Sequence, residues 1–314
     1  MSELIGALKG ALDYTRLYRD QTFVIKIGGE ILSDPERTQA LAQQLALLES
    51  ISVRVILVHG GGPQATDLAR ELGHEPQIIA GRRVTCTDTL QVAKMVFAGT
   101  LNVDILAALR SQGVRAVGLS GVDGELVTAR RRQPVSVTDD DGDTKTVDFG
   151  HVGDIESVDP TVLHTLLEAK FMPVVASLAA DRRGHPLNVN ADGVAQAIAS
   201  QVNAQKLIFL TNSPGLLRDP EDPDSLVAFA DPTDLDALSA AGAISGGMRP
   251  KLDACIRAVR NGVRRTHIID GRRPDALLIE LFTGSGCGTM IVDKKEKQDY
   301  SAHELETGAG VAAG

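Results

Sequence analysis

The sequence predicts an α/β fold in which helices cover both faces of a mainly parallel sheet. Two observations support this: continuous apolar runs recur along the 314 residues, and segments with helical periodicity separate them. Continuous rather than alternating apolar runs are typical of strands that are buried on both faces, as in parallel sheets. The expected strands are 23–27, 53–58, 116–119, 172–177, 206–210, 266–270 and 276–282.

The segments between these runs predict helices. Leu41, Leu45 and Leu48 recur at i, i+4 and i+7, and segments 91–112 and 191–203 have similar spacing. The first twenty residues predict a further amphipathic helix, which carries Leu4, Leu8, Leu12, Tyr14 and Tyr18. That helix either packs on its own domain or reaches a second subunit, and the sequence leaves both possibilities open.

Residues 125–150 interrupt the alternation of strands and helices. Two β-like stretches flank a turn rich in Asp and Gly, which predicts an inserted hairpin. The acidic run Asp139–Asp143 is expected to be a solvated turn, because placing Gly142 at position 6 of an EF-hand loop puts Val137 at position 1. The tail 293–314 is charged and then rich in small residues, so we expect disorder at its end.

Composition excludes several classes of protein. Apolar residues make up 43% and charged residues 23%, which is ordinary for a globular protein of about two domains. The formal net charge of −9 disfavours a nucleic-acid partner, and no apolar run approaches the roughly 18 residues of a membrane span. Three cysteines, Cys86, Cys255 and Cys287, lack metal-ligand spacing, so a reducing, cytoplasmic setting is expected.

Glycines follow the first two expected strands, where a phosphate could approach bare backbone. The first strand ends Lys26-Ile27-Gly28-Gly29, and a lysine within an apolar strand needs an anionic partner. The second ends His59-Gly60-Gly61-Gly62-Pro63 before a helix, an arrangement that forms an anion-binding nest. No Walker P-loop motif is present. A G-x-G-x-x-A match at residues 60–65 lacks the acidic partner that dinucleotide binding requires.

Two more motifs carry candidate ligand-binding groups. Arg82 and Arg83 follow a glycine, and an arginine there could clamp a carboxylate through two hydrogen bonds. In LNVNADG (187–193), Asn188 could face a ligand, whereas Asp192 is either a functional carboxylate or a helix N-cap.

The C-terminal third contributes two candidates for nucleotide binding. TNSPGLL (211–217) follows a buried strand and predicts a turn whose backbone lines a nucleotide pocket. Lys251 stands near the start of a helix, where a positive charge opposes the helix dipole. That mismatch favours a role facing phosphate over that of an ordinary surface lysine.

Seven motifs occur in order within residues 22–292: KIGGE, HGGGP, AGRRVT, GLSGVDG, LNVNAD, LTNSPGLL and GGMRPK. Together they resemble the amino-acid kinase family, and within it the members that use ATP to phosphorylate the γ-carboxylate of N-acetyl-L-glutamate, the second step of arginine synthesis. The resemblance implies a three-layer αβα sandwich with a central, mainly parallel sheet. The implied parts are an N-terminal helical arm (1–21), an N-lobe for the acyl amino acid (22–205), a C-lobe for ATP (206–292) and a C-terminal tail (293–314).

The resemblance also implies roles for individual residues. The implied catalytic residues are Lys26 and Lys251, which stabilise the transferring phosphoryl group, and Asp192, which holds both lysines. The implied substrate contacts are Gly61, Gly62, Arg83 and Asn188. The implied ATP contacts are Gly28, Gly29, Asn212, Ser213, Pro214, Gly215 and Leu216. Mg²⁺ is expected on the ATP phosphates without a separate protein cage, and no general base is expected, because the attacking carboxylate is ionised at neutral pH.

Regulation by arginine is implied by both ends of the chain. Arginine-inhibited members of the family carry a similar helix before the first strand, which links dimers into a hexamer, a trimer of dimers. A cytoplasmic homo-oligomer, dimer or hexamer, is therefore expected. The implied arginine contacts are Tyr18, Asp275, Glu280, Gly286 and Gly288. Two residues depart from the family pattern: Asp275 replaces a usual His and could help or hinder arginine binding, and Asn212 replaces a usual Asp, which puts the affinity for ATP in question.

Three alternative functions remain. A kinase for aminoadipate or glutamate attached to an acidic carrier protein would need positive charge at the site mouth, which Arg82 and Arg130–Arg132 could supply. A noncatalytic arginine sensor would keep the fold, but both lysines, both glycine motifs and Asp192 are present. A dinucleotide oxidoreductase is disfavoured by the missing acidic residue.

Overall fold

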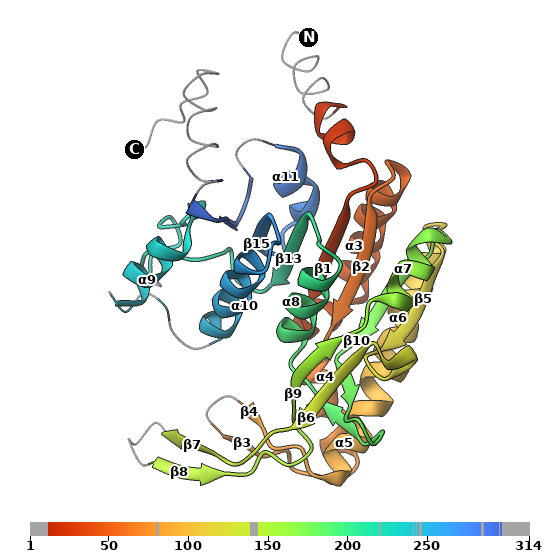
Figure 1. The fold of residues 1–314 in the computed structure, drawn as a ribbon, viewed down its shortest axis with the longest axis vertical. Helices are drawn as coiled ribbons and strands as arrows, with labels where there is room; N and C mark the ends of the chain where they lie inside the picture. Colours follow the sequence, from red (N-terminus) through yellow and green to blue (C-terminus); the bar gives the residue numbers. More distant parts are fainter. Residues whose placement is uncertain are drawn as a thin grey trace.

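A computed structural model of the chain describes residues 12–79, 82–138, 144–219, 221–240, 242, 244, 247–283, 286–294 and 296. Its centre is an eight-stranded sheet with the order β14-β16-β15-β13-β1-β2-β10-β5 (Figure 1). Neighbouring strands are parallel except for the antiparallel pair β15–β16. The strands are β1 (Thr22–Ile27), β2 (Arg54–His59), β5 (Ala116–Ser120), β10 (Met172–Ala176), β13 (Lys206–Thr211), β14 (Phe229–Ala230), β15 (Arg265–Asp270) and β16 (Thr289–Ile291).

Helices pack on both faces of this sheet, so the predicted αβα sandwich is confirmed (Figure 1). Val24 of β1 joins the apolar cluster of one face and Ile25 that of the other, as the alternation of strand side chains requires. The first face carries α7 (Thr161–Glu168), α8 (Ala191–Gln201), α9 (Pro232–Ala240) and α10 (Met248–Arg260). The second carries α2 (Gly29–Leu32), α3 (Pro35–Ser50), α6 (Asn102–Ser111) and α11 (Ala276–Phe282).

A third apolar cluster lies under the glycine-rich loop that follows β2. It is built from α4 (Gly62–Glu71), α5 (Thr87–Lys94) and a π-helical segment, η1 (Met95–Leu101). From α5 to α6 the chain is one continuous helical stretch, Thr87–Ser111. An 18-residue window within it has a mean hydropathy of 1.6, so the stretch is apolar enough to cross a membrane by length and composition alone. We did not expect such a segment. Phe97, Leu101 and Leu109 are buried against the rest of the chain, which favours an internal helix.

Smaller sheets are attached to one end of the main sheet. A four-stranded sheet has the order β12-β11-β6-β9, and two hairpins, β3–β4 and β7–β8, project beside it (Figure 1). The bounds are β3 (Ile78–Ile79), β4 (Arg82–Arg83), β6 (Val127–Arg131), β7 (Val135–Thr138), β8 (Thr144–Val147), β9 (Gly153–Val158), β11 (Leu178–Ala180) and β12 (Pro186–Asn188), with a short 3₁₀ helix, η2, at Asp123–Glu125.

The predicted insertion at 125–150 is confirmed in part. The hairpin itself is β7–β8, whereas β6 pairs with β9 in the four-stranded sheet. The acidic run Asp139–Asp143 lies outside the described residues.

The predicted strand at 276–282 is wrong, because this segment is helix α11. Its buried residues, Ala276, Leu277, Glu280 and Leu281, recur with helical spacing. A short apolar run does not by itself separate a buried strand from a buried helix. The charged Glu280 within the run was the signal against a strand that is buried on both faces.

The described part of the N-terminal arm packs on its own chain through one side. Residues 12–18 are helical, and Tyr18 is buried with its hydroxyl donating to the Leu281 carbonyl oxygen at 3.1 Å. Tyr14 meets the edge of Phe282, but Leu12 and Leu17 are exposed. Packing on its own domain is therefore confirmed for the tyrosine side, and Leu4 and Leu8 lie outside the described residues.

Candidate active site

The carboxyl ends of β1, β2 and β13 meet at one edge of the sheet. From β1 the chain continues to β2 on one side, while β13 returns on the other side of β1. Ligands of open α/β sheets bind at such a switch point, outside the carboxyl ends of the strands. Both glycine motifs lie there, since Gly28 follows β1 and Gly60 follows β2.

The two glycine loops pack directly on each other. A β-carbon added at Gly29 would lie 3.3 Å from the Cα of Gly61, and Gln64 Nε2 donates to the Gly29 carbonyl oxygen at 2.7 Å. A β-carbon at Gly61 would overlap Phe97 and Leu101 of η1. The loops need glycine at these positions because backbone meets backbone on one side and apolar side chains on the other.

Backbone N–H groups are left over where α4 begins. The first backbone bond of the helix runs from the Ala65 N–H to the Gly61 carbonyl oxygen. Within the described residues no backbone acceptor is recorded for the Gly61 N–H, and a β-carbon at Gly62 would meet open space. A helix N-terminus with free N–H groups binds anions. The Gly28 N–H, in contrast, already donates to the Leu210 carbonyl oxygen at 3.2 Å.

Lys26 and Asp192 form a buried ion pair beside these loops. Lys26 Nζ lies 2.8 Å from Asp192 Oδ1, and their side chains are 11% and 9% exposed. Asp192 is in the first turn of α8, but the N-cap of that helix is Asn190, whose side chain accepts from the Gly193 N–H at 3.0 Å. The alternative that Asp192 is merely a cap is therefore wrong, and its carboxylate is the partner that Lys26 needs.

Lys251 lies on the neighbouring helix α10 but does not reach Asp192. Its Nζ donates to the Gly247 carbonyl oxygen at 3.1 Å. One turn later, burial raises the pKa of the Cys255 thiol to about 12, and the charges of Asp192 and Lys251 both act on that thiol. The charges of both groups therefore reach the same buried sulfur, although the structure brings only Lys26 into contact with the carboxylate.

Arg83, at the end of β4, presents an incompletely paired cation. Its Nη2 donates to the Gly62 carbonyl oxygen at 2.7 Å and to the Thr66 hydroxyl, whereas its buried Nη1 has no hydrogen-bond partner. Burial, and then the charge of Arg70, lowers the pKa of Arg83. No carboxylate among the described residues forms an ion pair with this guanidinium, so an anionic ligand fits it.

Asn188, at the end of β12, lies in the same region. Its Nδ2 donates to the Thr85 hydroxyl at 3.1 Å, and Thr85 is two residues beyond Arg83. The structure therefore brings Gly62, Arg83 and Asn188 to one side of the loop that follows β2. The side chain of Arg82 is outside the described part of the chain.

The turn after β13 is fixed by its own polar groups. The Ser213 N–H donates to Thr211 Oγ1 at 3.0 Å, and Ser213 Oγ donates to the Gly215 carbonyl oxygen at 3.0 Å. Asn212 is exposed, and Ser213 and Pro214 are half-buried. Leu216 instead packs in the core, and its N–H donates to Thr289 Oγ1 at 2.8 Å, so its role here is packing.

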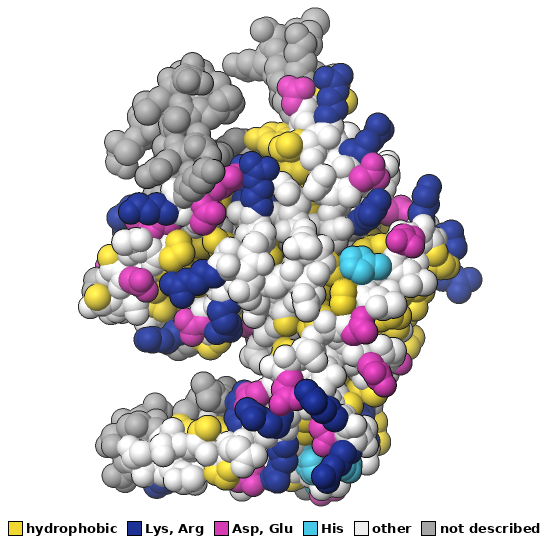
Figure 2. Space-filling view, viewed as in Figure 1, with side chains coloured by type: hydrophobic (Ala, Val, Ile, Leu, Met, Phe, Trp, Pro, Cys, Tyr) yellow, Lys and Arg dark blue, Asp and Glu magenta, His cyan; other side chains and the backbone are white. Residues whose placement is uncertain are grey.

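An open cleft separates the elements that carry these groups. Figure 2 shows it between the projecting hairpins and the region of α9 and α10. Arg83 belongs to a hairpin on one side and Lys251 to α10 on the other. Groups suited to a small carboxylate and to phosphates therefore come from opposite sides of one cleft.

The arginines at and just after the end of β6 do not add an unpaired basic patch to this cleft. Arg131 lies 2.8 Å from Asp148, and Arg132 lies 2.6 Å from Asp154. Arg130 lies 3.9 Å from Glu156. Each of these three arginines has a carboxylate partner, although Glu156 also lies 3.7 Å from Arg182. This pairing weakens the support for an acidic carrier protein. Within the described residues no group of three or more His, Cys, Asp or Glu side chains could hold a metal ion.

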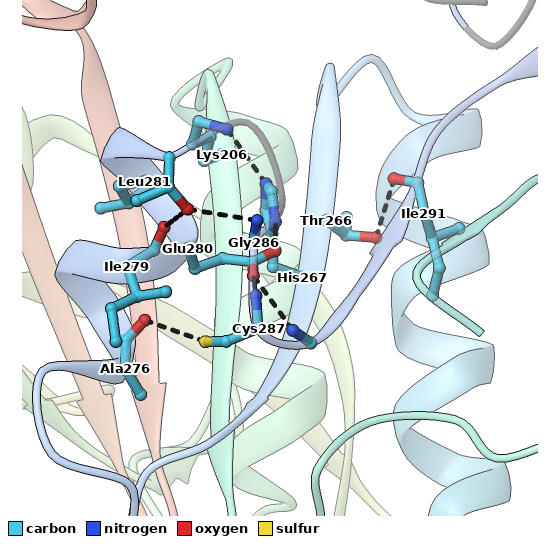
Figure 3. A network of polar contacts seen from close by, with 12 residues as sticks. Lys206, Thr266, His267, Ala276, Ile279, Glu280, Leu281, Gly286, Cys287 and Ile291 are labelled. Carbon is cyan, nitrogen blue, oxygen red and sulfur yellow. Dashed lines mark hydrogen bonds and ion pairs between the residues drawn. The ribbon is translucent and has the colours of Figure 1, made fainter. Parts of the chain in front are cut away.

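A second polar network lies toward the opposite edge of the sheet (Figure 3). Lys206 begins β13, and its Nζ is 3.0 Å from Nε2 of His267 in β15. The other ring nitrogen of His267, Nδ1, is 2.7 Å from Oε1 of Glu280 in α11. The order ammonium, imidazole, carboxylate assigns the ring proton to Nδ1, because Nε2 then accepts from the ammonium and Nδ1 donates to the carboxylate.

Burial shifts the pKa of every member of this network. It lowers the pKa of His267 to about 4, helped by the charge of Lys206, and lowers the pKa of Lys206 to about 7, helped by Arg265. For Glu280, burial opposes ionisation, but hydrogen bonds from His267 and the Cys287 N–H outweigh it and lower the pKa to about 2. The imidazole is therefore neutral at pH 7, beside an ionised carboxylate and an amine that titrates near that pH.

The network joins most of the residues that were expected to bind arginine. Glu280 Oε2 accepts from the N–H groups of Cys287 and Gly288 at 2.7 and 3.1 Å. Gly286 has φ +59°, which favours glycine, and the Lys206 ammonium lies 5.3 Å from the centre of the Tyr18 ring. Asp275, at the other end of α11, is exposed and lies outside these hydrogen bonds.

Sequence reasoning missed Lys206 and His267. The signal that identified Lys26, a charged residue in an apolar strand, also occurs in KLIFL and THIID. It also missed the side-chain contact of His59 with Asn102, since nothing in the sequence relates residues 43 positions apart.

Comparison with known proteins identifies close relatives over most of the chain. A model of the amino acid kinase family matches residues 21–270. The chain is 46% identical over 298 residues to the acetylglutamate kinase of Myxococcus xanthus, which covers 95% of this chain and 97% of that protein. It is 41% identical over 281 residues to the acetylglutamate kinase of Methanothrix thermoacetophila, which covers 90% of this chain and 96% of that protein.

Solved structures give a consistent picture. N-acetylglutamate synthase from Neisseria gonorrhoeae, complexed with coenzyme A and N-acetyl-glutamate, superposes with a TM-score of 0.78 at 28% identity. That alignment covers 92% of this chain, and the chain spans 63% of that synthase chain. The same synthase complexed with L-arginine superposes with a TM-score of 0.77 at 25% identity and 92% coverage of this chain. Carbamate kinase from Giardia lamblia, at 15% identity and a TM-score of 0.61, shares the fold.

Proposed function

The chain belongs to the amino acid kinase family, and from this premise we propose that it phosphorylates the γ-carboxylate of N-acetyl-L-glutamate with ATP, in arginine biosynthesis. The observation that carries the proposal is the buried Lys26–Asp192 pair beside the Gly61 N–H and Arg83. Among the described residues, no backbone acceptor is recorded for that N–H and no carboxylate pairs with that arginine. This set suits a phosphoryl group next to a small carboxylic acid. The high identity to acetylglutamate kinases over nearly the whole chain supports the choice of acid.

Phosphoryl transfer in this site is mainly a matter of position and charge. The Lys26 ammonium and the N–H groups of Gly61 and Gly62 stabilise the negative charge on the transferring group. Asp192 holds Lys26 in place at 2.8 Å. Lys251 leaves the Gly247 carbonyl oxygen and approaches the phosphates from α10 when the cleft is filled. The attacking carboxylate is already ionised, so no residue needs to remove a proton.

Arg83 and Asn188 recognise the acyl amino acid. The buried Nη1 of Arg83, which lacks a partner in the described chain, donates to the substrate α-carboxylate. Asn188, fixed by Thr85, contacts the neighbouring amide. Gly62 contributes backbone on the same side, because its carbonyl oxygen accepts from Arg83.

ATP occupies the other side of the cleft. Gly28 and Gly29 approach its phosphates, and the turn Asn212–Gly215 approaches the nucleoside, with Leu216 supporting the turn from the core. Mg²⁺ binds to the ATP phosphates and neutralises part of their charge.

A coupled assay of ADP release, with N-acetyl-L-glutamate, ATP and Mg²⁺, tests this function. We expect turnover of the free acetylated amino acid. Folded protein without turnover would reject the proposal and leave the noncatalytic sensor. Turnover only with an acyl carrier protein would identify the alternative kinase, which the paired arginines at and just after the end of β6 disfavour.

We further propose that arginine inhibits the enzyme by binding near Tyr18, Glu280, Gly286 and Gly288. Lys206 there offers a cation to an α-carboxylate, because His267 is the one hydrogen-bond acceptor recorded for its Nζ in the described residues. Asp275, outside the network, is a fifth candidate. The structure of the related synthase with L-arginine supports the choice of ligand.

The N-terminal arm links this regulation to assembly. We propose a cytoplasmic homo-oligomer in which the arm, with its exposed Leu12 and Leu17, joins dimers into a hexamer. Millimolar arginine should then reduce activity, and removing residues 1–20 should reduce the hexamer to dimers by size-exclusion mass. Unchanged activity with arginine would reject the regulation, and an unchanged mass would reject the arm as a linker.

A further inference from the structure

His59 is a buried polar residue that the chemistry proposed above does not use. It ends β2, directly before the glycine loop, and its side chain is completely buried. Its Nε2 lies 3.2 Å from Nδ2 of Asn102, and its Nδ1 lies 2.9 Å from the Gly60 carbonyl oxygen. The imidazole therefore joins the long helical stretch to the first peptide of the loop.

The contacts of Asn102 determine which ring nitrogen carries the proton. Asn102 Nδ2 also lies 3.1 Å from the Val174 carbonyl oxygen, which can only accept, so this atom must be the amide nitrogen. Its second hydrogen points to His59 Nε2 at 3.2 Å, which is nearer than the Leu119 carbonyl oxygen at 3.5 Å. The Gly60 carbonyl oxygen beside Nδ1 can only accept, so Nδ1 must donate and Nε2 must accept. The proton of the neutral ring is therefore on Nδ1, and it is donated to the Gly60 carbonyl oxygen.

This hydrogen bond fixes the orientation of the peptide between Gly60 and Gly61. The peptide is trans, so its carbonyl oxygen and its N–H point in opposite directions. Because the oxygen is held toward the buried imidazole, the Gly61 N–H points away from the core. That N–H has no backbone acceptor in the described chain.

We propose that His59 and Asn102 are positioning residues that aim the Gly61 N–H at the transferring phosphoryl group. The pair acts through the loop and touches neither substrate. The inference rests on the proposed kinase function, because it assigns a purpose to one of the N–H groups of that site.

The surrounding packing supports a rigid arrangement. Phe97 and Leu101 of η1 fill the space beneath Gly61, and Asn102 directly follows that π-helical segment. A β-carbon at Gly118 would overlap the side-chain oxygen of Asn102, so glycine leaves the room that this amide occupies. Burial lowers the pKa of His59 to about 4, which keeps the ring neutral and able to accept from Asn102 at pH 7.

Two substitutions test the hydrogen bonds of the two ring nitrogens separately. His59→Asn places an amide nitrogen near the position of Nδ1 and keeps the donor to Gly60. His59→Gln places an amide oxygen near the position of Nε2 and keeps only the acceptor for Asn102. We expect His59→Gln to lower kcat about 10- to 100-fold with little change in KM, and His59→Asn to stay within about threefold of wild type.

Leu109→Ala is the control for stability, since Leu109 is buried further along α6 than Asn102 and lies outside the site. It should lower the melting temperature without lowering kcat. Equal losses of kcat in His59→Asn and His59→Gln, or wild-type kcat in His59→Gln, would overturn the proposal.

The tautomer of His59 gives a readout that is independent of activity. Long-range ¹H–¹⁵N spectra of the full chain should show two histidines, His59 and His267, that stay neutral with the proton on Nδ1 between pH 6 and 8. The signal that remains in His267→Gln belongs to His59. A proton on Nε2 would overturn the inference. Absent turnover by the wild type would instead reject the kinase function, while the tautomer still reports on His59.

Discussion

The two buried histidines of the main sheet have similarly lowered pKa values but different surroundings. Burial lowers the pKa of His59 and of His267 to about 4. His59 is bound by an amide and a carbonyl group, both neutral, whereas His267 lies between the Lys206 ammonium and the Glu280 carboxylate. The first network stands at the carboxyl edge of the sheet and the second toward the amino edge.

This difference suggests two different roles for a buried histidine side chain. Around His59 each nitrogen of the ring has a fixed partner, so the network holds a loop in one orientation. Around His267 two charges are kept apart by one imidazole, and Lys206, whose pKa is about 7, gains or loses its proton near neutral pH. The neutral network holds one geometry, whereas the ionic network contains a group that titrates near neutral pH.

The largest expected effect is at the catalytic edge. Lys26→Ala should lower kcat by about 10³-fold or more, about 4 kcal/mol of transition-state stabilisation, because the buried carboxylate of Asp192 then faces the phosphates without its cation. The ADP-release assay measures kcat, and circular dichroism verifies the fold. Lys170→Ala, at an exposed turn, is the matched control. A loss of less than tenfold would remove Lys26 from the chemistry.

The ionic network should show its importance in stability. Glu280→Gln removes the carboxylate while Lys206 and His267 stay buried, and we expect a loss of about 3 kcal/mol in the free energy of unfolding in urea. Glu49→Gln, on the exposed side of α3, should change it by less than about 0.5 kcal/mol. If both variants unfold alike, the network contributes nothing to stability and the contrast with His59 disappears.

Acid should weaken the fold through His59. Its pKa is about 4 in the folded chain and 6.5 in the unfolded chain, so the unfolded state binds more protons between these values. The contribution of His59 to the free energy of unfolding should therefore rise by about 3 kcal/mol from pH 4 to pH 6.5 and then level off. His267, whose pKa is also about 4, adds a similar rise in both proteins. Urea unfolding across this range should show a shallower slope for His59→Asn. Parallel curves for the variant and the wild type would contradict the burial argument.

The smallest effect should be at the substrate clamp. Arg83→Ala should raise KM for N-acetyl-L-glutamate about 10- to 100-fold, about 1.4 to 3 kcal/mol, and change kcat little, because the α-carboxylate does not react. Arg70→Ala removes a charge near Arg83 and an exposed ion pair with Glu75, and it should leave KM within about twofold. An unchanged KM in Arg83→Ala would exclude it from the clamp.

Local patterns in the sequence were sufficient to predict most of the main sheet. Apolar runs placed β1, β2, β10, β13 and β15 within about one residue of their observed bounds. The prediction of a strand at 276–282 failed because a seven-residue apolar segment is short enough to be either a strand or a helix. The segment is a helix that packs against Tyr18 and the segment around Cys287. The prediction for β6 was wrong in part, because its partner is β9, which lies beyond the β7–β8 hairpin in the sequence.

The candidate site was predictable where a charged residue stands within an apolar strand. Lys26 in an apolar strand required an anion, and the structure supplies Asp192. Lys206 carries the same signal, but no glycine motif follows it, so a ligand site there was not predicted. Contacts such as His59 with Asn102 join residues that are distant in sequence, so only the folded chain identifies them.

Engineering meets a constraint at Gly61. Phe97 and Leu101 leave no room for a β-carbon there, so these two side chains determine the path of the loop. A library that replaces glycines by larger residues, or exchanges leucine and phenylalanine, to raise heat resistance would change this packing. Variants selected for survival at high temperature should therefore keep residues 61, 97 and 101 unchanged, or gain their robustness at the expense of turnover.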